Sequence, residues 1–321
     1  MQFRTTIFVT LFVVALATPA AAQRFPFERS FDVGAAHVVD ISTLRGAINV
    51  RVGDPGRVIV SGTVTVRVAW DSPANAVDLA RKVAARPPIE QNGERLILRP
   101  PSDAAESRAV TVAYDLRVPR DTQVRAVSDS GAIVVKDVGG HVEVRTQSSA
   151  IALADLGQTA DVETGSGAVN VDRADGAVRI STSSSAITAR GLRGGLRART
   201  GSGHIVGTFA GQGAVDVRTQ SSAIDLNGVS GALTTWTESG RTIVTGVPSA
   251  GWDVSSGSGG IDVSFDTSIN ATLQASTGSG TVRAPGLRVN GSVEKDRIAG
   301  AIGTGGPLVK LASRSGSIRI R

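Results

Sequence analysis

Residues 127–321 repeat a single pattern of apolar and polar positions. Each repeat begins with a small polar turn that contains Ser-Gly or Ser-Ser, and apolar residues follow it at fixed intervals. We call the second residue of each such pair the turn anchor. The anchors are Gly131, Ser149, Gly167, Ser185, Gly203, Ser222, Gly240, Gly259 and Gly280. Successive anchors lie about 18 residues apart, and slightly further apart after Gly203, a spacing that is typical of a repeat protein.

The apolar positions within each repeat indicate two short strands. In the first repeat, Ile133 and Val135 form one alternating pair and Val142 and Val144 form another, with Val138 between them. A period of two marks a half-buried strand. Because one repeat cannot bury its own apolar face, the repeats must stack on one another. The sequence therefore predicts an all-β fold, a single-stranded parallel β-solenoid of the β-helix or β-roll type, with rungs of about 18 residues.

The length of one full turn and the handedness of the solenoid stay open at this point. The anchors alternate between Gly and Ser from Gly131 to Ser222, so a double unit of about 36 residues is an alternative. We favour the shorter rung because five inward positions suit a narrow core. A last clear copy of the pattern centres on Gly316, and we expect a degenerate unit before it, near residues 298–303. About ten rungs would form a rod on the order of 50 Å long.

Residues 1–22 have the features of a secretory signal peptide. Arg4 precedes a short apolar run, and Ala20 and Ala22 form a small-residue cleavage pattern before Gln23. The run is short for a membrane span, and no later segment is apolar enough to be one. We therefore expect an exported bacterial protein, located in the periplasm, on the cell surface or in the medium, with no integral membrane segment in the mature chain.

Residues 23–126 differ from the repeats and predict a β-rich cap that includes the first rungs. One helix is expected at about residues 73–86, because Pro73 suits a first helical turn and Ala76, Leu79 and Val83 share one face. Such a region can cover the open end of a solenoid, whose apolar core and strand edges would otherwise meet water. At the other end, the alternating arginines of "SIRIR" are expected to discourage edge pairing.

Composition and charge narrow the class of partner. The chain has no cysteine, which excludes disulfides and thiolate chemistry, and its net charge of +6 falls to +5 once Arg4 leaves with the signal peptide. An exported basic protein suits anionic glycans, other cell-envelope components or another protein, and not nucleic acid. The candidate ligand-facing residues are the densest group of arginines and three outward polar positions: Arg190, Arg193, Arg197, Arg199, Gln147, Asn170 and Thr188.

No motif for catalysis, a metal or a cofactor accompanies this pattern. The three histidines lie in unrelated contexts, and we interpret them as surface residues rather than metal ligands. Calcium-binding β-rolls need an aspartate in each turn, and these turns lack it. Asp161 and Glu163 alternate along one strand and face outward, without a recurring basic partner. The few Trp residues are expected to be plugs or loop anchors. We therefore expect no catalytic residue, no metal, no cofactor and no enzymatic activity.

One stretch carries a resemblance to a known family. The sequence "YDLRVPRDTQVRAVSDSGAIVVKDVGGHVEVRTQSSAIALADL" resembles the bacterial putative-adhesin domain, a domain of unknown function with SG-x-I repeats, and is similar to the head domain of auto-transporter adhesins. The resemblance covers roughly residues 31–321. It implies a β-solenoid, an envelope or surface location, and an adhesive or scaffolding role, with no catalytic residues. The family's acidic residue after the SG pair is mostly alanine here, as at Ala132 and Ala150.

The sequence thus predicts an exported, non-enzymatic, adhesin-like β-solenoid whose repetitive polar face binds envelope or surface components. Two alternatives are a glycan-active enzyme on the same scaffold and a purely structural envelope scaffold.

Overall fold

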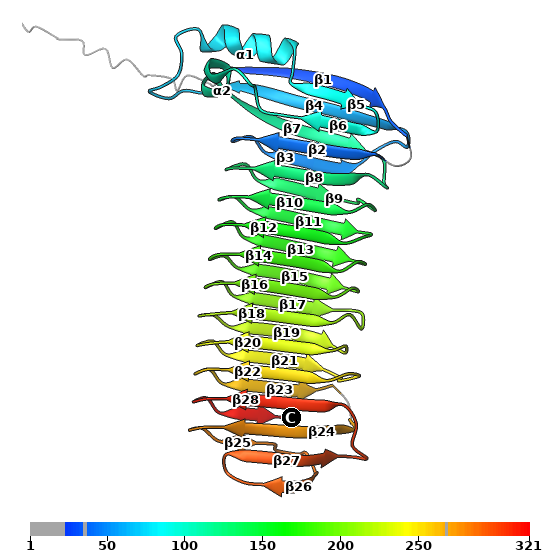
Figure 1. Cartoon of the computed structure of the whole chain (residues 1–321), viewed down its shortest axis with the longest axis vertical. Helices are drawn as coiled ribbons and strands as arrows, with labels where there is room; N and C mark the ends of the chain where they lie inside the picture. The colour runs from blue at the N-terminus through cyan, green and yellow to red at the C-terminus, as the bar shows by residue number, and fades with distance from the viewer. Residues whose placement is uncertain (1–22, 35–36, 267–268) are drawn as a thin grey trace, which may run out of the picture.

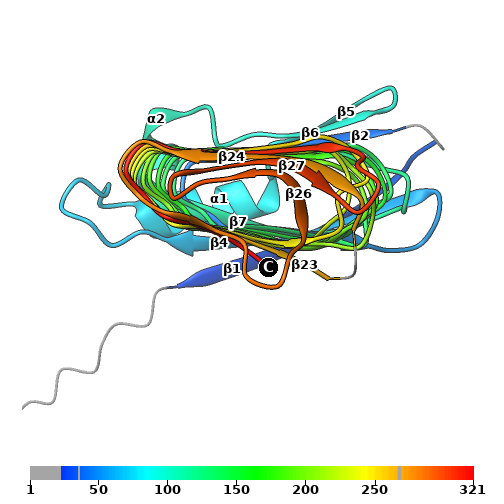
Figure 2. The same ribbon diagram turned by 90° about the horizontal axis from the view of Figure 1, so that it is seen from below.

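The computed structural model describes residues 23–34, 37–266 and 269–321; the predicted signal peptide, residues 1–22, lies outside them. The described chain forms a long rod of two mostly parallel sheets that face each other, one of 14 strands (sheet A) and one of 15 (sheet B) (Figures 1 and 2). The chain passes from one sheet to the other and back along most of the rod, so consecutive strands lie in different sheets.

Each full turn of the chain matches one predicted rung and contributes one strand to each sheet. Val142 lies beside Ala160, and Ala160 beside Val178, in parallel register. The alternative of a double-length turn is therefore wrong. In the regular part of the rod, sheet A contains β9 (Ile133–Lys136), β11 (Ile151–Leu156), β13 (Val169–Ala174), β15 (Ile187–Leu192), β17 (Ile205–Phe209), β19 (Ile224–Val229), β21 (Thr242–Gly246) and β23 (Ile261–Phe265). Sheet B contains β8 (Gln123–Ser128), β10 (Val142–Thr146), β12 (Ala160–Thr164), β14 (Val178–Thr182), β16 (Leu196–Thr200), β18 (Val215–Thr219), β20 (Leu233–Thr237) and β22 (Trp252–Ser256).

The core lies between the two sheets and follows the apolar pattern of the sequence. The five inward positions predicted for the first repeat, Ile133, Val135, Val138, Val142 and Val144, are all fully buried. Stacking places the equivalent residues of successive rungs on top of one another, so their side chains form continuous apolar columns. The predicted inward positions are confirmed here.

A sixth inward column is polar and was not predicted. It consists of one buried hydroxyl per rung at the end of each sheet B strand: Ser128, Thr146, Thr164, Thr182, Thr200, Thr219, Thr237 and Ser256. The Thr200 hydroxyl accepts a hydrogen bond from the backbone N–H of Gly203 (3.0 Å) and donates to the carbonyl of Ser185 in the preceding rung (3.2 Å). Hydroxyls of this column thus supply partners for backbone groups that the tight turn leaves outside the sheets.

The N-terminal region closes one end of the rod. Its strands are β1 (Arg24–Asp32), β2 (Val38–Thr43), β3 (Ile48–Val52), β4 (Arg57–Val66), β5 (Ile89–Asn92), β6 (Arg95–Leu98) and β7 (Val110–Val118). In sheet A, β1, β4 and β7 pair antiparallel, and β7 meets the parallel stack through β3. In sheet B, β2 joins the hairpin of β5 and β6 to β8.

Two helices belong to this region, and the prediction of one helix is therefore corrected. Helix α1 (Ala76–Ala85) lies across the end of the rod and buries Ala80 and Val83 (Figure 1). Helix α2 (Ala104–Ala109) begins at Asp103, whose side chain accepts hydrogen bonds from the N–H groups of Ala105 and Glu106 (2.8 and 2.9 Å). With six residues, α2 is too short to show helical periodicity in the sequence.

Within this region, an ion pair joins β2 to the residue that follows β6. Both guanidinium ends of Arg99 contact the carboxylate of the buried Asp40 (2.8 and 3.0 Å). The Arg99 hydrogen bond holds the pKa of Asp40 below its ordinary value.

The C-terminal end has a different strand order from that of the rest of the rod. Its strands are β24 (Ala271–Thr277), β25 (Val282–Arg283), β26 (Val289–Val293), β27 (Arg297–Ile302), β28 (Leu308–Ser313) and β29 (Ile318–Ile320). Strand β28 lies between β22 and β24, and β29 lies between β23 and β25. The last rung in the sequence is therefore inserted between two earlier ones, and β26 and β27 lie beyond it (Figure 1).

Two expectations for this end are corrected. Residues 298–303 were expected to form a degenerate rung, but most of them belong to β27, which pairs antiparallel with β24 and β26. The "SIRIR" segment was expected to form the exposed edge, but β29 has a neighbour on each side. Its Arg319 points outward from an internal strand, as any polar residue of a rung does.

Candidate charged binding face

The outward side of sheet B carries more charged side chains in the regular rungs than the outward side of sheet A. Parallel register aligns equivalent residues of successive strands into columns that run along the rod. We call the outward charged residues of β8 to β18 the charged face: Arg125, Glu143, Arg145, Asp161, Glu163, Arg179, Arg197, Arg199, Asp216 and Arg218. The outward side of sheet A is less charged at the same level, with Val134, Ala152, Asn170, Thr188 and Val206 in one column.

One half of the charged face is balanced in charge and internally paired. The Glu143 carboxylate contacts Arg125 (3.7 Å) and Arg145 (3.1 Å), and Arg145 also contacts Glu163 (3.5 Å). Asp161 contacts His141 (3.6 Å) and Arg179 (3.4 Å). These pairs are open to water, so each contributes little to stability. Together they hold several long side chains in a defined arrangement across neighbouring rungs.

The other half has a surplus of positive charge. Arg197, Arg199 and Arg218 all contact the one carboxylate of Asp216, at 3.4, 3.9 and 3.0 Å. One negative charge therefore faces three positive charges on two neighbouring strands. Trp236 of β20 lies beside Arg218 of β18, and its side chain is 38 % exposed. Guanidinium groups bind carboxylate, sulfate and phosphate groups with two parallel hydrogen bonds, so this half suits an anionic ligand.

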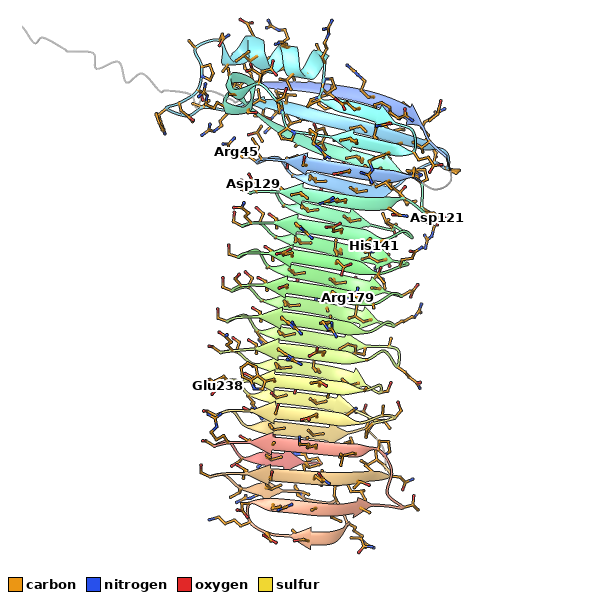
Figure 3. The ribbon with its side chains drawn as sticks, viewed as in Figure 1. Arg45, Asp121, Asp129, His141, Arg179 and Glu238 are labelled. Atoms are coloured by element: carbon orange, nitrogen blue, oxygen red, sulfur yellow. The ribbon has the colours of Figure 1, made fainter. Side chains whose placement is uncertain are left out.

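A shallow hollow connects the two halves. It has a volume of about 380 Å³, and its lining includes His141, Asp161, Glu163, Arg179 and Arg199. Figure 3 shows His141 and Arg179 on the flat side of the rod, whereas Asp129 and Glu238 lie along one edge and Asp121 along the opposite edge. The surface is long and open, which suits an extended chain better than a small molecule.

The structure separates the predicted ligand-facing residues. Arg197 and Arg199 lie on β16 in the charged face, but Arg190 lies on β15 in sheet A, and Arg193 occupies the turn between them and pairs with Asp175 (3.1 Å). The four arginines are close in sequence, yet the chain rounds the edge of the rod within that segment. The remaining predicted residues are also dispersed: Asn170 and Thr188 are neighbours on sheet A, and Gln147 stands at a turn.

Sequence reasoning missed Arg179, Asp216 and Arg218 as members of the same surface. The spacing of Arg179 and Arg197 could have identified them as neighbours. They lie one rung apart, and equivalent positions in successive rungs are adjacent in the sheet. A high local density of arginines in the sequence did not identify the binding surface, because residues that are adjacent on this surface lie one rung apart in the sequence.

His37 corrects the expectation that all three histidines are surface residues. Its side chain is 1 % exposed, and its ring contacts the carbonyl of Gly34 and the hydroxyl of Thr122. It therefore serves as a hydrogen-bonded core residue near the N-terminal end. Within residues 23–34, 37–266 and 269–321, no group of three His, Asp or Glu side chains gathers to hold a metal ion.

Comparisons with known proteins support the resemblance in part. The family model Toastrack DUF4097 matches residues 210–321, about the last third of the chain. This agrees with a domain family of unknown function for that segment, whereas the sequence resemblance was expected over roughly residues 31–321. No curated protein matches the chain. No helix among the described residues has the length and apolar character that a membrane span requires.

A solved structure from Clostridium sporogenes ATCC 15579, described as that of a putative cell adhesion protein, is also similar. It shares 11 % identity over 92 % of this chain and 98 % of its own, with a TM-score of 0.19. At this score the similarity does not bear on function.

Proposed function

We propose that this chain is an exported, non-enzymatic, adhesin-like protein that binds an anionic glycan of the cell envelope through its charged face. The observation that carries the proposal is the sharing of Asp216 by Arg197, Arg199 and Arg218, which leaves unneutralised guanidinium groups on a rigid surface. We also infer that the regular parallel turns make the rod a single-stranded β-solenoid, which would keep this surface rigid.

The geometry favours a polymer over a single small anion. The arginines recur in register on adjacent strands, which lie about 4.8 Å apart. A chain of acidic sugars laid along the rod can contact several of them at once. The first contact then raises the effective concentration for the next, and many weak contacts add to a useful affinity. Trp236, beside Arg218, offers an apolar surface for a sugar ring.

We expect the variant R197S/R199S/R218S to bind an acidic polysaccharide about tenfold or more weakly than the unchanged protein. Each lost exposed charge contact is worth about 0.5–1 kcal/mol, and about 1.4 kcal/mol corresponds to tenfold in affinity. The measurement is titration of the chain from Gln23 onward with polygalacturonate at low and at high salt. Salt should weaken the unchanged protein more than the variant.

The matched control removes three outward arginines from sheet A, in the variant R117S/R190S/R319S. It has the same net charge as the first variant, and we expect it to bind almost normally. Equal loss in both variants would show that only net charge matters, and loss in the control alone would restore the predicted role of Arg190. No binding by the unchanged protein at low salt would overturn the proposal.

A glycan-active enzyme is the second candidate, because Asp161 and Glu163 line the same hollow as the arginines. Both carboxylates are paired with arginine, which favours a binding role. Prolonged incubation with the polysaccharides that bind, followed by analysis for shortened chains, separates the two candidates. Products that disappear in the variant D161N/E163Q would establish the enzyme.

A further inference from the structure

The loop between β4 and α1 presents two apolar side chains fully to solvent. Trp70 is 98 % exposed and Val68 is 84 % exposed, more than any other large apolar residue that the structure describes. Trp residues were expected to be plugs or loop anchors, and Trp252 is such a plug: it is buried, with its indole N–H donated to the carbonyl of Gly231 (3.0 Å). Trp70 makes no such contact, so its exposure needs another explanation.

The loop is ordered without any help from these side chains. The Ser72 hydroxyl accepts from the N–H of Ala69 (3.0 Å) and donates to the carbonyl of Arg67 (2.8 Å). The Arg67 side chain contacts the carboxylate of Asp71 (3.2 Å), and its backbone N–H donates to the carbonyl of Ala109 (2.8 Å). A polar framework therefore holds the turn, and Trp70 and Val68 project from it. We call Val68 and Trp70 the apolar tip.

The surroundings of the apolar tip are basic. Arg24 of β1 lies opposite Thr65 of β4 in the sheet, just before the loop. The carbonyl of Arg108 accepts a hydrogen bond from the Arg67 side chain (3.3 Å). Both Arg24 and Arg108 are exposed, and within the described residues neither forms an ion pair. An exposed aromatic residue with arginines near it is a composition found where proteins meet a lipid headgroup layer. Basic residues also draw a protein to anionic lipids.

The place of the tip in the molecule points to the same partner. The backbone N–H of Val66 donates to the carbonyl of Gln23 (3.0 Å), so the tip adjoins the point where the predicted mature chain begins. Residues 1–22 before this point contain the apolar run of the predicted leader. During the export that we propose, removal of the leader would release this end of the rod at the membrane surface. Figure 1 shows the loop at the end of the rod opposite the C-terminal strands.

We propose that the apolar tip inserts into the interface of an anionic lipid bilayer and fastens the N-terminal end of the rod to a membrane surface. The charged face of sheet B then extends away from the membrane and stays free for its own ligand. This inference does not depend on the proposed glycan binding, because the two surfaces share no residue.

The test uses the chain from Gln23 onward, which contains every helix and strand that the structure describes, with vesicles of phosphatidylglycerol and phosphatidylethanolamine. We expect co-sedimentation with the vesicles, and about a tenfold weaker partition for W70A or V68D. Because neither side chain supports the fold, thermal unfolding should be unchanged. W236A, which removes the other exposed Trp, serves as the matched control and should partition normally.

A second readout is quenching of Trp fluorescence by brominated lipid, which should be lost in W70A and kept in W236A. Partition should also fall when phosphatidylcholine replaces the anionic lipid. The proposal is overturned if the unchanged protein does not co-sediment with the vesicles, or if W70A and W236A partition to the same extent. W70A should still bind polygalacturonate, which would show that vesicle binding and glycan binding use different surfaces.

Discussion

Truncation of the chain after Gly303 is expected to unfold the C-terminal end of the rod back to the residues that follow β23. The removed segment contains β28 and β29, which lie between β22 and β24 and between β23 and β25. It also removes four buried side chains, Val309, Leu311, Ile318 and Ile320. At about 1.5–3 kcal/mol each, their burial contributes roughly 6–12 kcal/mol, which the short segments beyond them cannot replace.

Limited proteolysis followed by mass spectrometry measures this effect. New cleavage sites should appear between residues 266 and 303, while the rungs from β8 to β22 stay protected. A peptide of residues 304–321 added in trans should restore protection, because it can occupy the vacated place. A matched peptide with V309D and L311D should not restore it. Full resistance of the truncated chain would contradict the expectation, since β24 and β25 would then have moved to pair with β22 and β23.

The same strand order shows where sequence reasoning reaches its limit. The apolar spacing predicted the inward residues and the length of the rung, because each rung repeats the same steric problem and solves it with the same positions. That equivalence also removes any local signal for strand order. Val309 lies next to Trp252, which belongs to a strand far earlier in the chain, but nothing in the pattern around Val309 distinguishes that neighbour from another rung.

The candidate site was only partly predictable, because the sequence shows which residues face outward but not which of them become neighbours. Outward residues were identified as outward, yet the grouping of Arg190 with Arg197 ignored the edge of the rod between them. Register, once known, brings Arg199 next to Arg218 although the two belong to successive rungs. His37 and α2 were missed for different reasons. A core histidine depends on partners distant in sequence, such as Thr122, and a helix of six residues carries almost no periodicity.

Glycine stands at several turn anchors for a steric reason. Neighbouring turns nest so closely that a Cβ atom on Gly167 would lie 1.6 Å from the carbonyl oxygen of Ser149 in the preceding rung. The same contact would be 1.7 Å at Gly203 and at Gly240. At a Ser anchor, by contrast, the turn has room for a side chain: the Ser149 hydroxyl donates a hydrogen bond to the carbonyl of Ser130 (2.6 Å).

Substitution of Gly167 by alanine should therefore destabilise the protein by about 3 kcal/mol, the upper range for overpacking a well-packed site. The added methyl group must push two backbone turns apart, and this also strains the hydrogen bond from the Gly167 N–H to Thr164 (3.0 Å). S149A is the matched control one rung away. It loses one partly exposed hydrogen bond and should cost about 1 kcal/mol. Urea unfolding followed by circular dichroism compares the two variants. Equal midpoints would show that the turns can separate freely, and glycine at these anchors would then need a cause other than close nesting.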